Sequence, residues 1–150
     1  MENDSALGER KMKVLLVYPE TPVTYWSFKY AVPFVRKKAL LPPLGLLTVA
    51  ALLPDSVEVQ LVDMNTDVLE SSDILHADLV LVSAMIVQKK SFEEVVQRCN
   101  RLGRKVVAGG PYPTSMHESI KGVDYFVLGE GEQVVPRFFA DCLAGKAERV

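Results

Sequence analysis

The sequence KVVAGGPYPT, residues Lys105–Thr114, carries the strongest structural signal in the chain. Its first four residues, Lys105–Ala108, predict a short buried strand, and the pair Gly109–Gly110 follows directly. Glycine lacks a Cβ and tolerates positive φ, so the pair lets a ligand come close to the carboxyl end of a parallel strand. Thr114 is expected to begin the next helix, where the hydroxyls of Thr114 and Ser115 and the free N–H groups suit an anion. A turn that needs glycine only for its shape is the alternative.

Segments typical of strands and of helices alternate along the rest of the chain. This alternation predicts an α/β fold, a doubly wound five-stranded parallel sheet that is Rossmann-like, with the flavodoxin-type order 2-1-3-4-5. The remaining predicted strands are Lys13–Tyr18, Val57–Val62, Asp78–Ser83 and Asp124–Leu128. The predicted helices are Leu44–Leu53, Val68–Leu75, Lys89–Leu102, Thr114–Ile120 and Gln133–Leu143.

Small residues recur where the predicted strands end. Because the carboxyl ends of parallel strands meet at one edge of a sheet, these residues clear that edge for a large, flat or extended ligand. The carboxylates of Glu130 and Glu132 favour a ligand with hydroxyl or amide donors, although they also stabilise the start of the following helix. The residues concerned are Ser83, Ala84, Gly109, Gly110, Gly129, Glu130, Gly131 and Glu132.

Length and composition indicate one globular domain. The chain has 150 residues, of which 24% are charged and 49% hydrophobic, and its net charge is −2. This balance argues against nucleic-acid binding, and no apolar run reaches the roughly 18 residues that cross a membrane. Cys99 and Cys142 lie far apart without metal-ligand spacing, which fits a reducing cytoplasm. Residues 1–12 are expected to form a disordered lead-in and residues 13–150 the domain.

The long connection Pro19–Pro42 and the following helix are unusually apolar. Loops of this length are usually functional or disordered, and the aromatic content favours a wall over a flat ligand or an interface. A satellite cluster packed on the domain is the alternative. The helix Leu44–Leu53 is apolar nearly all round, so it is expected to be buried or to lie beneath something else. The aromatic residues of the loop are Tyr25, Trp26, Phe28, Tyr30 and Phe34.

Several familiar ligands of such folds fit poorly. Asp63 could bind a ribose, but no GxGxxG follows the first strand, so NAD is disfavoured. Asp63 is expected to form a turn or a helix cap, and a hydrogen bond to a ligand is the alternative. A receiver domain needs an aspartate where Ser83 stands. Thr21–Thr24 is a poor flavin phosphate loop. His117 lies close to the expected site, but an isolated histidine is more often a surface residue, and His76 belongs to the opposite edge.

Four stretches together resemble a known family. They are LPPLGLLTVAALLP (Leu41–Pro54), LVDMN (Leu61–Asn65), VVAGGPYPT (Val106–Thr114) and VLGEGE (Val127–Glu132). In their order and spacing they resemble the N-terminal cobalamin-binding domain of cobalamin-dependent radical S-adenosylmethionine enzymes, a group with hopanoid methyltransferases and tetrapyrrole cyclases. The resemblance covers nearly the whole chain from Lys13 onward.

The resemblance implies that the corrin ring of cobalamin lies over the carboxyl edge of the sheet and that its nucleotide tail runs among the strand ends. Tyr25 and Trp26, in the aromatic loop, would cover the lower face of the ring. The cofactor-binding residues that it implies are Ser83 and Ala84 near the tail, Gly109, Gly110 and Thr114 along the tail and its phosphate, and Gly129, Glu130, Gly131 and Glu132 near the ring amides or the tail sugar.

Two departures from related sequences limit what the resemblance implies. The Asp-x-His-x-x-Gly motif is absent, so cobalt would lack a protein imidazole. The CxxxCxxC motif is absent too, so the iron–sulfur cluster and S-adenosylmethionine would belong to a C-terminal radical S-adenosylmethionine barrel outside this chain. The resemblance therefore implies a module without catalytic residues of its own, in a larger methyltransferase or cyclase. A flavodoxin-like interaction domain without cobalamin stays open as the alternative.

Overall fold

A computed structural model describes residues 10–23 and 43–147 of the chain. The aromatic loop residues Tyr25–Phe34 and most of the expected lead-in lie outside the described residues. The described elements alternate between strands and helices throughout, as the sequence pattern predicts.

The sheet has five parallel strands in the order β2-β1-β3-β4-β5, which confirms the predicted topology. Its interior strands are rich in valine and leucine because residues of a doubly covered parallel sheet are buried on both faces. The strands are β1 (Met12–Tyr18), β2 (Val57–Asp63), β3 (Leu79–Ser83), β4 (Lys105–Gly109) and β5 (Tyr125–Val127).

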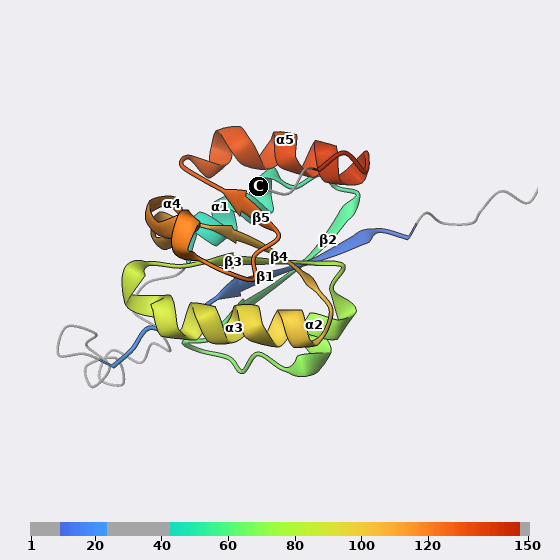
Figure 1. Cartoon of the computed structure of the whole chain (residues 1–150). Coiled ribbons are helices and arrows are strands. Elements are labelled where there is room, and N and C mark those ends of the chain that lie inside the picture. Colours follow the sequence, from blue (N-terminus) through green and yellow to red (C-terminus); the bar gives the residue numbers. More distant parts are fainter. Residues whose placement is uncertain (1–9, 24–42, 148–150) are drawn as a thin grey trace, which may run out of the picture.

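Helices cover both faces of the sheet, with α1 (Leu44–Leu52) and α5 (Gly131–Leu143) on one side and α2 (Ser71–His76) and α3 (Lys89–Arg101) on the other (Figure 1). Successive β1 residues alternate between the two cores: Leu15 lies on the α3 side and Leu16 on the α1 side. The short elements η3 (Ile86–Gln88), α4 (Pro111–Met116) and η4 (His117–Ser119) complete the chain.

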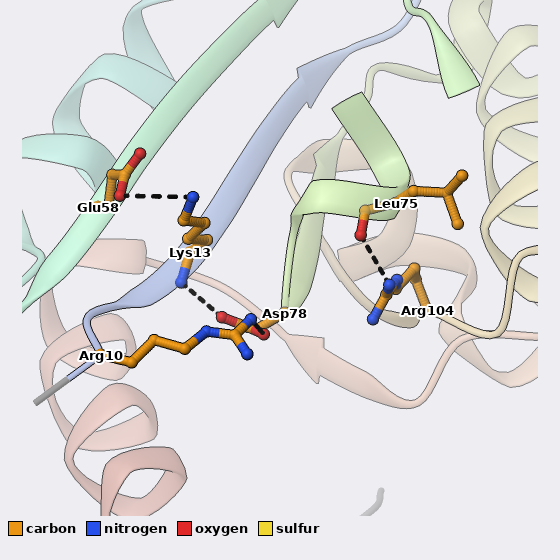
Figure 2. A network of polar contacts seen from close by, with 6 residues as sticks. All are labelled: Arg10, Lys13, Glu58, Leu75, Asp78 and Arg104. Carbon is orange, nitrogen blue, oxygen red and sulfur yellow. Dashed lines mark hydrogen bonds and ion pairs between the residues drawn. The ribbon is translucent and has the colours of Figure 1, made fainter. Parts of the chain in front are cut away.

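The amino edge of the sheet is held by acidic side chains that accept backbone hydrogen bonds. The Asp78 carboxylate accepts one from the Lys13 N–H at 2.8 Å and pairs with Arg10 at 2.8 Å (Figure 2). Asp124 plays the same part for β4, because its Oδ2 accepts from the Val106 N–H at 2.9 Å. These contacts fix the register at the edge opposite the glycine-rich one.

Three sequence predictions need correction. Helix α4 begins at Pro111 rather than Thr114, because Gly110 takes the position before the helix with φ 89° and proline suits the first helical residue. Helix α2 begins at Ser71 rather than Val68, because Glu70 and Asp73 form a capping box. Helix α1 is not buried all round in the described structure, where Leu44 is 66% exposed, so of the two expectations for this helix only the one that it lies beneath something else is left.

Candidate ligand-binding cleft

A cleft of about 220 Å³ opens at the carboxyl ends of β3, β4 and β5, between α1 and α5. Its inner walls are aliphatic, and its mouth is bordered by glycines and two carboxylates. A slot of this kind accepts a flat apolar group at depth and polar groups at the opening. The aliphatic walls are Leu46, Val49, Leu81, Val107, Val127 and Val135; Val82 also borders the cleft, but its side chain packs in the core on the α3 side. The mouth has Gly45, Thr48, Ser83, Gly109, Gly110, Gly129, Glu130, Gly131 and Glu132.

Most of the sequence-predicted site residues come together here. Ala84 and Thr114 are not among the lining residues: Ala84 is 1% exposed and binds neighbouring backbone, and Thr114 lies inside α4. Tyr25 and Trp26 lie outside the described residues. The predicted residues that line the cleft are Ser83, Gly109, Gly110, Gly129, Glu130, Gly131 and Glu132.

Gly110 is required by the packing of the protein itself. Its φ of 89° and ψ of −178° belong to a region that is essentially restricted to glycine. A Cβ at this position would lie 2.6 Å from Ser83 Oγ and 3.2 Å from the Ala84 backbone nitrogen. The β3 and β4 ends can therefore approach each other only with glycine at this position. The missing side chain is thus explained by the packing of the two strand ends, whether or not a ligand binds.

The loop after β5 borders the cleft differently. Gly129 has φ 77°, and its N–H donates to Thr114 Oγ1 at 3.2 Å, which ties this loop to α4. A Cβ on Gly131 would contact Val135 of α5 and Val49 of α1 at 3.7 and 3.8 Å. A larger side chain at this position would extend into the space between α1 and α5, so glycine at position 131 keeps the cleft open. The exposed carboxylates of Glu130 and Glu132 make the mouth negative.

Helix α1 supplies a wall that the sequence reading missed. It contributes Gly45, Leu46, Thr48 and Val49 to the cleft, and the Thr48 hydroxyl donates to the Leu44 carbonyl at 3.0 Å. Gly45 was the available signal, because glycine inside a helix costs stability and indicates a special need. No atom lies within 4 Å of a Cβ built on Gly45, so its missing side chain leaves open space.

The other polar candidates lie away from the cleft. The His117 ring packs edge-on against Phe126 at 6.0 Å between centroids, and Phe126 belongs to the α3 side of the sheet. His117 is therefore not placed beside the cleft, contrary to the sequence-based expectation. Asp63 forms the predicted turn, since its Oδ1 accepts from the Asn65 N–H at 2.9 Å. The described residues contain no cluster of three or more metal-ligating His, Cys, Asp or Glu side chains.

A parallel sheet with a glycine-bordered apolar cleft at its carboxyl edge defines a ligand-binding domain of the doubly wound class. A family model described as the B12 binding domain matches residues 34–139. The chain belongs to the B12 binding domain family, which confirms the family that the sequence motifs indicated. Within the part of the chain that the structure describes, no helix has the length and apolar character needed to cross a membrane.

Two curated relatives are similar to most of this chain. An uncharacterized methyltransferase of Synechocystis sp. is 40% identical over 129 residues, which is 85% of this chain and 24% of the relative. The hopanoid C-2 methylase of Rhodopseudomonas palustris is 31% identical over 124 residues, which is 82% of this chain and 24% of the relative. The chain thus spans about a quarter of the length of each of these relatives.

Proposed function

We propose that this chain binds cobalamin, with the nucleotide tail in the cleft between α1 and α5 and the corrin ring over the carboxyl edge of the sheet. The observation that carries the proposal is the cleft itself, which has aliphatic walls and a mouth bordered by glycines and two carboxylates. Family membership supplies the chemical class of the ligand.

The cleft fits the chemistry of the tail. A flat heteroaromatic base suits the aliphatic walls, to which α1 contributes Val49 and α5 contributes Val135. Ribose hydroxyls and the amide groups of the ring offer donors, and the carboxylates of Glu130 and Glu132 accept hydrogen bonds. Gly129 lets such groups approach the backbone closely, since no atom lies within 4 Å of a Cβ built there.

The proposal extends to residues that the cleft does not include. Ala84 would lie near the tail beside Ser83 of the cleft, Thr114 would support the tail-side loop through its contact with Gly129, and Tyr25 and Trp26 would cover the lower face of the ring. No histidine precedes Pro42 in the sequence, so no imidazole from this connection would reach cobalt.

In the intact protein, this module would hold the cofactor for methyl transfer. Bound cobalamin supplies a cobalt centre that carries a transferable methyl group. The residues of this chain bind and orient that cofactor, and none of them is assigned a catalytic role. The similarity to a methyltransferase and a hopanoid C-2 methylase, in each of which the matched region is 24% of the length, supports a partner domain. We infer that this partner is a radical S-adenosylmethionine barrel with its own iron–sulfur cluster.

A titration of the purified chain with hydroxocobalamin, followed by gel filtration, tests the proposal. The expected result is colour that elutes with the protein at a stoichiometry near one. Gly131→Leu fills the space between α1 and α5 and should abolish retention. Ala140→Leu adds the same side chain to an exposed position of the same helix and should leave retention unchanged. Absence of colour in the wild-type chain, or equal binding by Gly131→Leu, would contradict this assignment.

A further inference from the structure

The side chain of Gln88 is completely buried at the carboxyl edge of the sheet, next to the cleft but outside it. Its Oε1 accepts from the Met85 N–H at 2.9 Å. Its Nε2 donates to the Pro19 carbonyl at 2.7 Å and to Thr21 Oγ1 at 3.2 Å. Burying a carboxamide is costly unless it is hydrogen-bonded, and here both ends of the group are.

These bonds join the chain segments that follow two neighbouring strands, β1 and β3. The Pro19–Thr21 segment is held by two further side chains. Asn65 Oδ1 accepts from the Thr21 N–H at 2.8 Å, and Ser91 Oγ accepts from the Glu20 N–H at 2.9 Å. The segment after β1 is therefore fixed by groups from the β2 end, η3 and α3, and Gln88 is the buried member of this set.

The segment that Gln88 holds after β3 presents an apolar surface. Met85, Ile86 and Val87 are 39%, 60% and 53% exposed, although each is a large hydrophobic residue. They directly follow Ser83 and Ala84, and Ser83 lines the cleft. A ring attached to a tail in the cleft has to lie over this edge. An exposed aliphatic surface on a rigid support suits the face of a flat macrocycle.

We propose that Gln88 is a positioning residue for the corrin ring: it locks Pro19–Thr21 to Met85–Val87, and the locked pair forms the ring-side surface. This inference rests on the proposed function and deepens it. The cleft holds the tail, and the Gln88 assembly supports the ring. The two parts of the site are therefore separable by ligands that have or lack the tail.

The experiment measures the dissociation constants of the chain for hydroxocobalamin and for cobinamide, which has the ring but no nucleotide tail. Gln88→Met keeps the side-chain volume and removes every hydrogen bond, and Gln88→Glu keeps the acceptor and removes the donors. Both variants should bind both ligands more weakly, by roughly tenfold, the scale typical when a group that orients a binding surface is lost. Stoichiometry should stay near one. Gly131→Leu should weaken hydroxocobalamin alone.

Asp124→Leu is the control for stability, since it removes a buried acceptor at the opposite edge of the sheet. It should lower Tm to a similar degree and leave both dissociation constants unchanged. Wild-type affinity in the Gln88 variants, or equal weakening by Asp124→Leu, would overturn the positioning role while leaving the proposed function intact. Cobinamide that fails to bind the wild-type chain would also overturn it. A wild-type chain that binds neither ligand would remove the proposed function and this inference together.

Discussion

Gly110→Ala should be the most destabilising small change at the carboxyl edge. The backbone at Gly110 has φ 89° and ψ −178°, where a residue with a Cβ is strained by about 1–3 kcal/mol. The new Cβ would lie 2.6 Å from Ser83 Oγ and 3.2 Å from the Ala84 backbone oxygen, and overpacking of this kind costs about 1–3 kcal/mol. Together these effects predict a loss of about 2–6 kcal/mol in the free energy of unfolding.

Urea denaturation followed by circular dichroism measures this loss, and a double-mutant cycle separates its two parts. Ser83→Ala removes the hydroxyl nearest the new methyl group. In the Gly110→Ala background it should therefore recover about 1 kcal/mol, because residues in contact couple by about 0.5–3 kcal/mol. The strain of the backbone would remain. A Gly110→Ala chain within about 0.5 kcal/mol of wild type, or a cycle without coupling, would refute the described contact between the β3 and β4 ends.

Three further outcomes are expected. Gly45→Ala should raise the free energy of unfolding by about 0.5–1 kcal/mol in urea denaturation, because alanine loses less conformational freedom than glycine when helix α1 forms. The added methyl group meets no atom within 4 Å, so no clash offsets this gain. A lower free energy of unfolding would contradict the helical conformation and open space described at Gly45. Burial raises the pKa of the Cys99 thiol from 9.0 to about 11, so the thiol's contribution to stability is complete below pH 9. The free energy of unfolding should fall by about 2–3 kcal/mol as pH rises to 11. Cys99→Ala should reduce that fall, and an equal dependence of stability on pH in the variant would exclude the thiol as its cause. Replacing both His76 and His117 with alanine should leave the visible spectrum of bound hydroxocobalamin unchanged, and a shifted spectrum would indicate an imidazole on cobalt.

The sheet was predictable because its strands are marked by local sequence. Continuous apolar runs such as Val14–Val17 leave little choice but burial on both faces, and alternation with helices then favours one topology. Helix starts were less predictable. The start of α4 depends on an unusual backbone conformation at Gly110, and Ser71 begins α2 because two acidic side chains form its cap. Such choices depend on a few atoms rather than on a periodic pattern.

The candidate site was predictable only where glycines mark strand ends. The residues after β4 and β5 stand out in the sequence, and most of them line the cleft. The contribution of α1 to the cleft was missed because an apolar helix is interpreted as part of the core, whether it packs on the sheet or lines a cleft. Gln88 was missed for the opposite reason: a glutamine between a strand and a helix is normally interpreted as a solvent-exposed residue. Only the fold brings it under Pro19, 69 positions away in sequence.

Mapping the backbone amides by ¹⁵N–¹H correlation spectra during addition of hydroxocobalamin tests the central claim most directly. The account predicts one-to-one saturation, with the largest shifts at Gly129 and Gly131 and at Gly45 across the cleft. The amides of Asp78 and Asp124, at the opposite edge, should not move. Shifts centred on that opposite edge, or a spectrum that does not change, would contradict cobalamin binding in the cleft between α1 and α5.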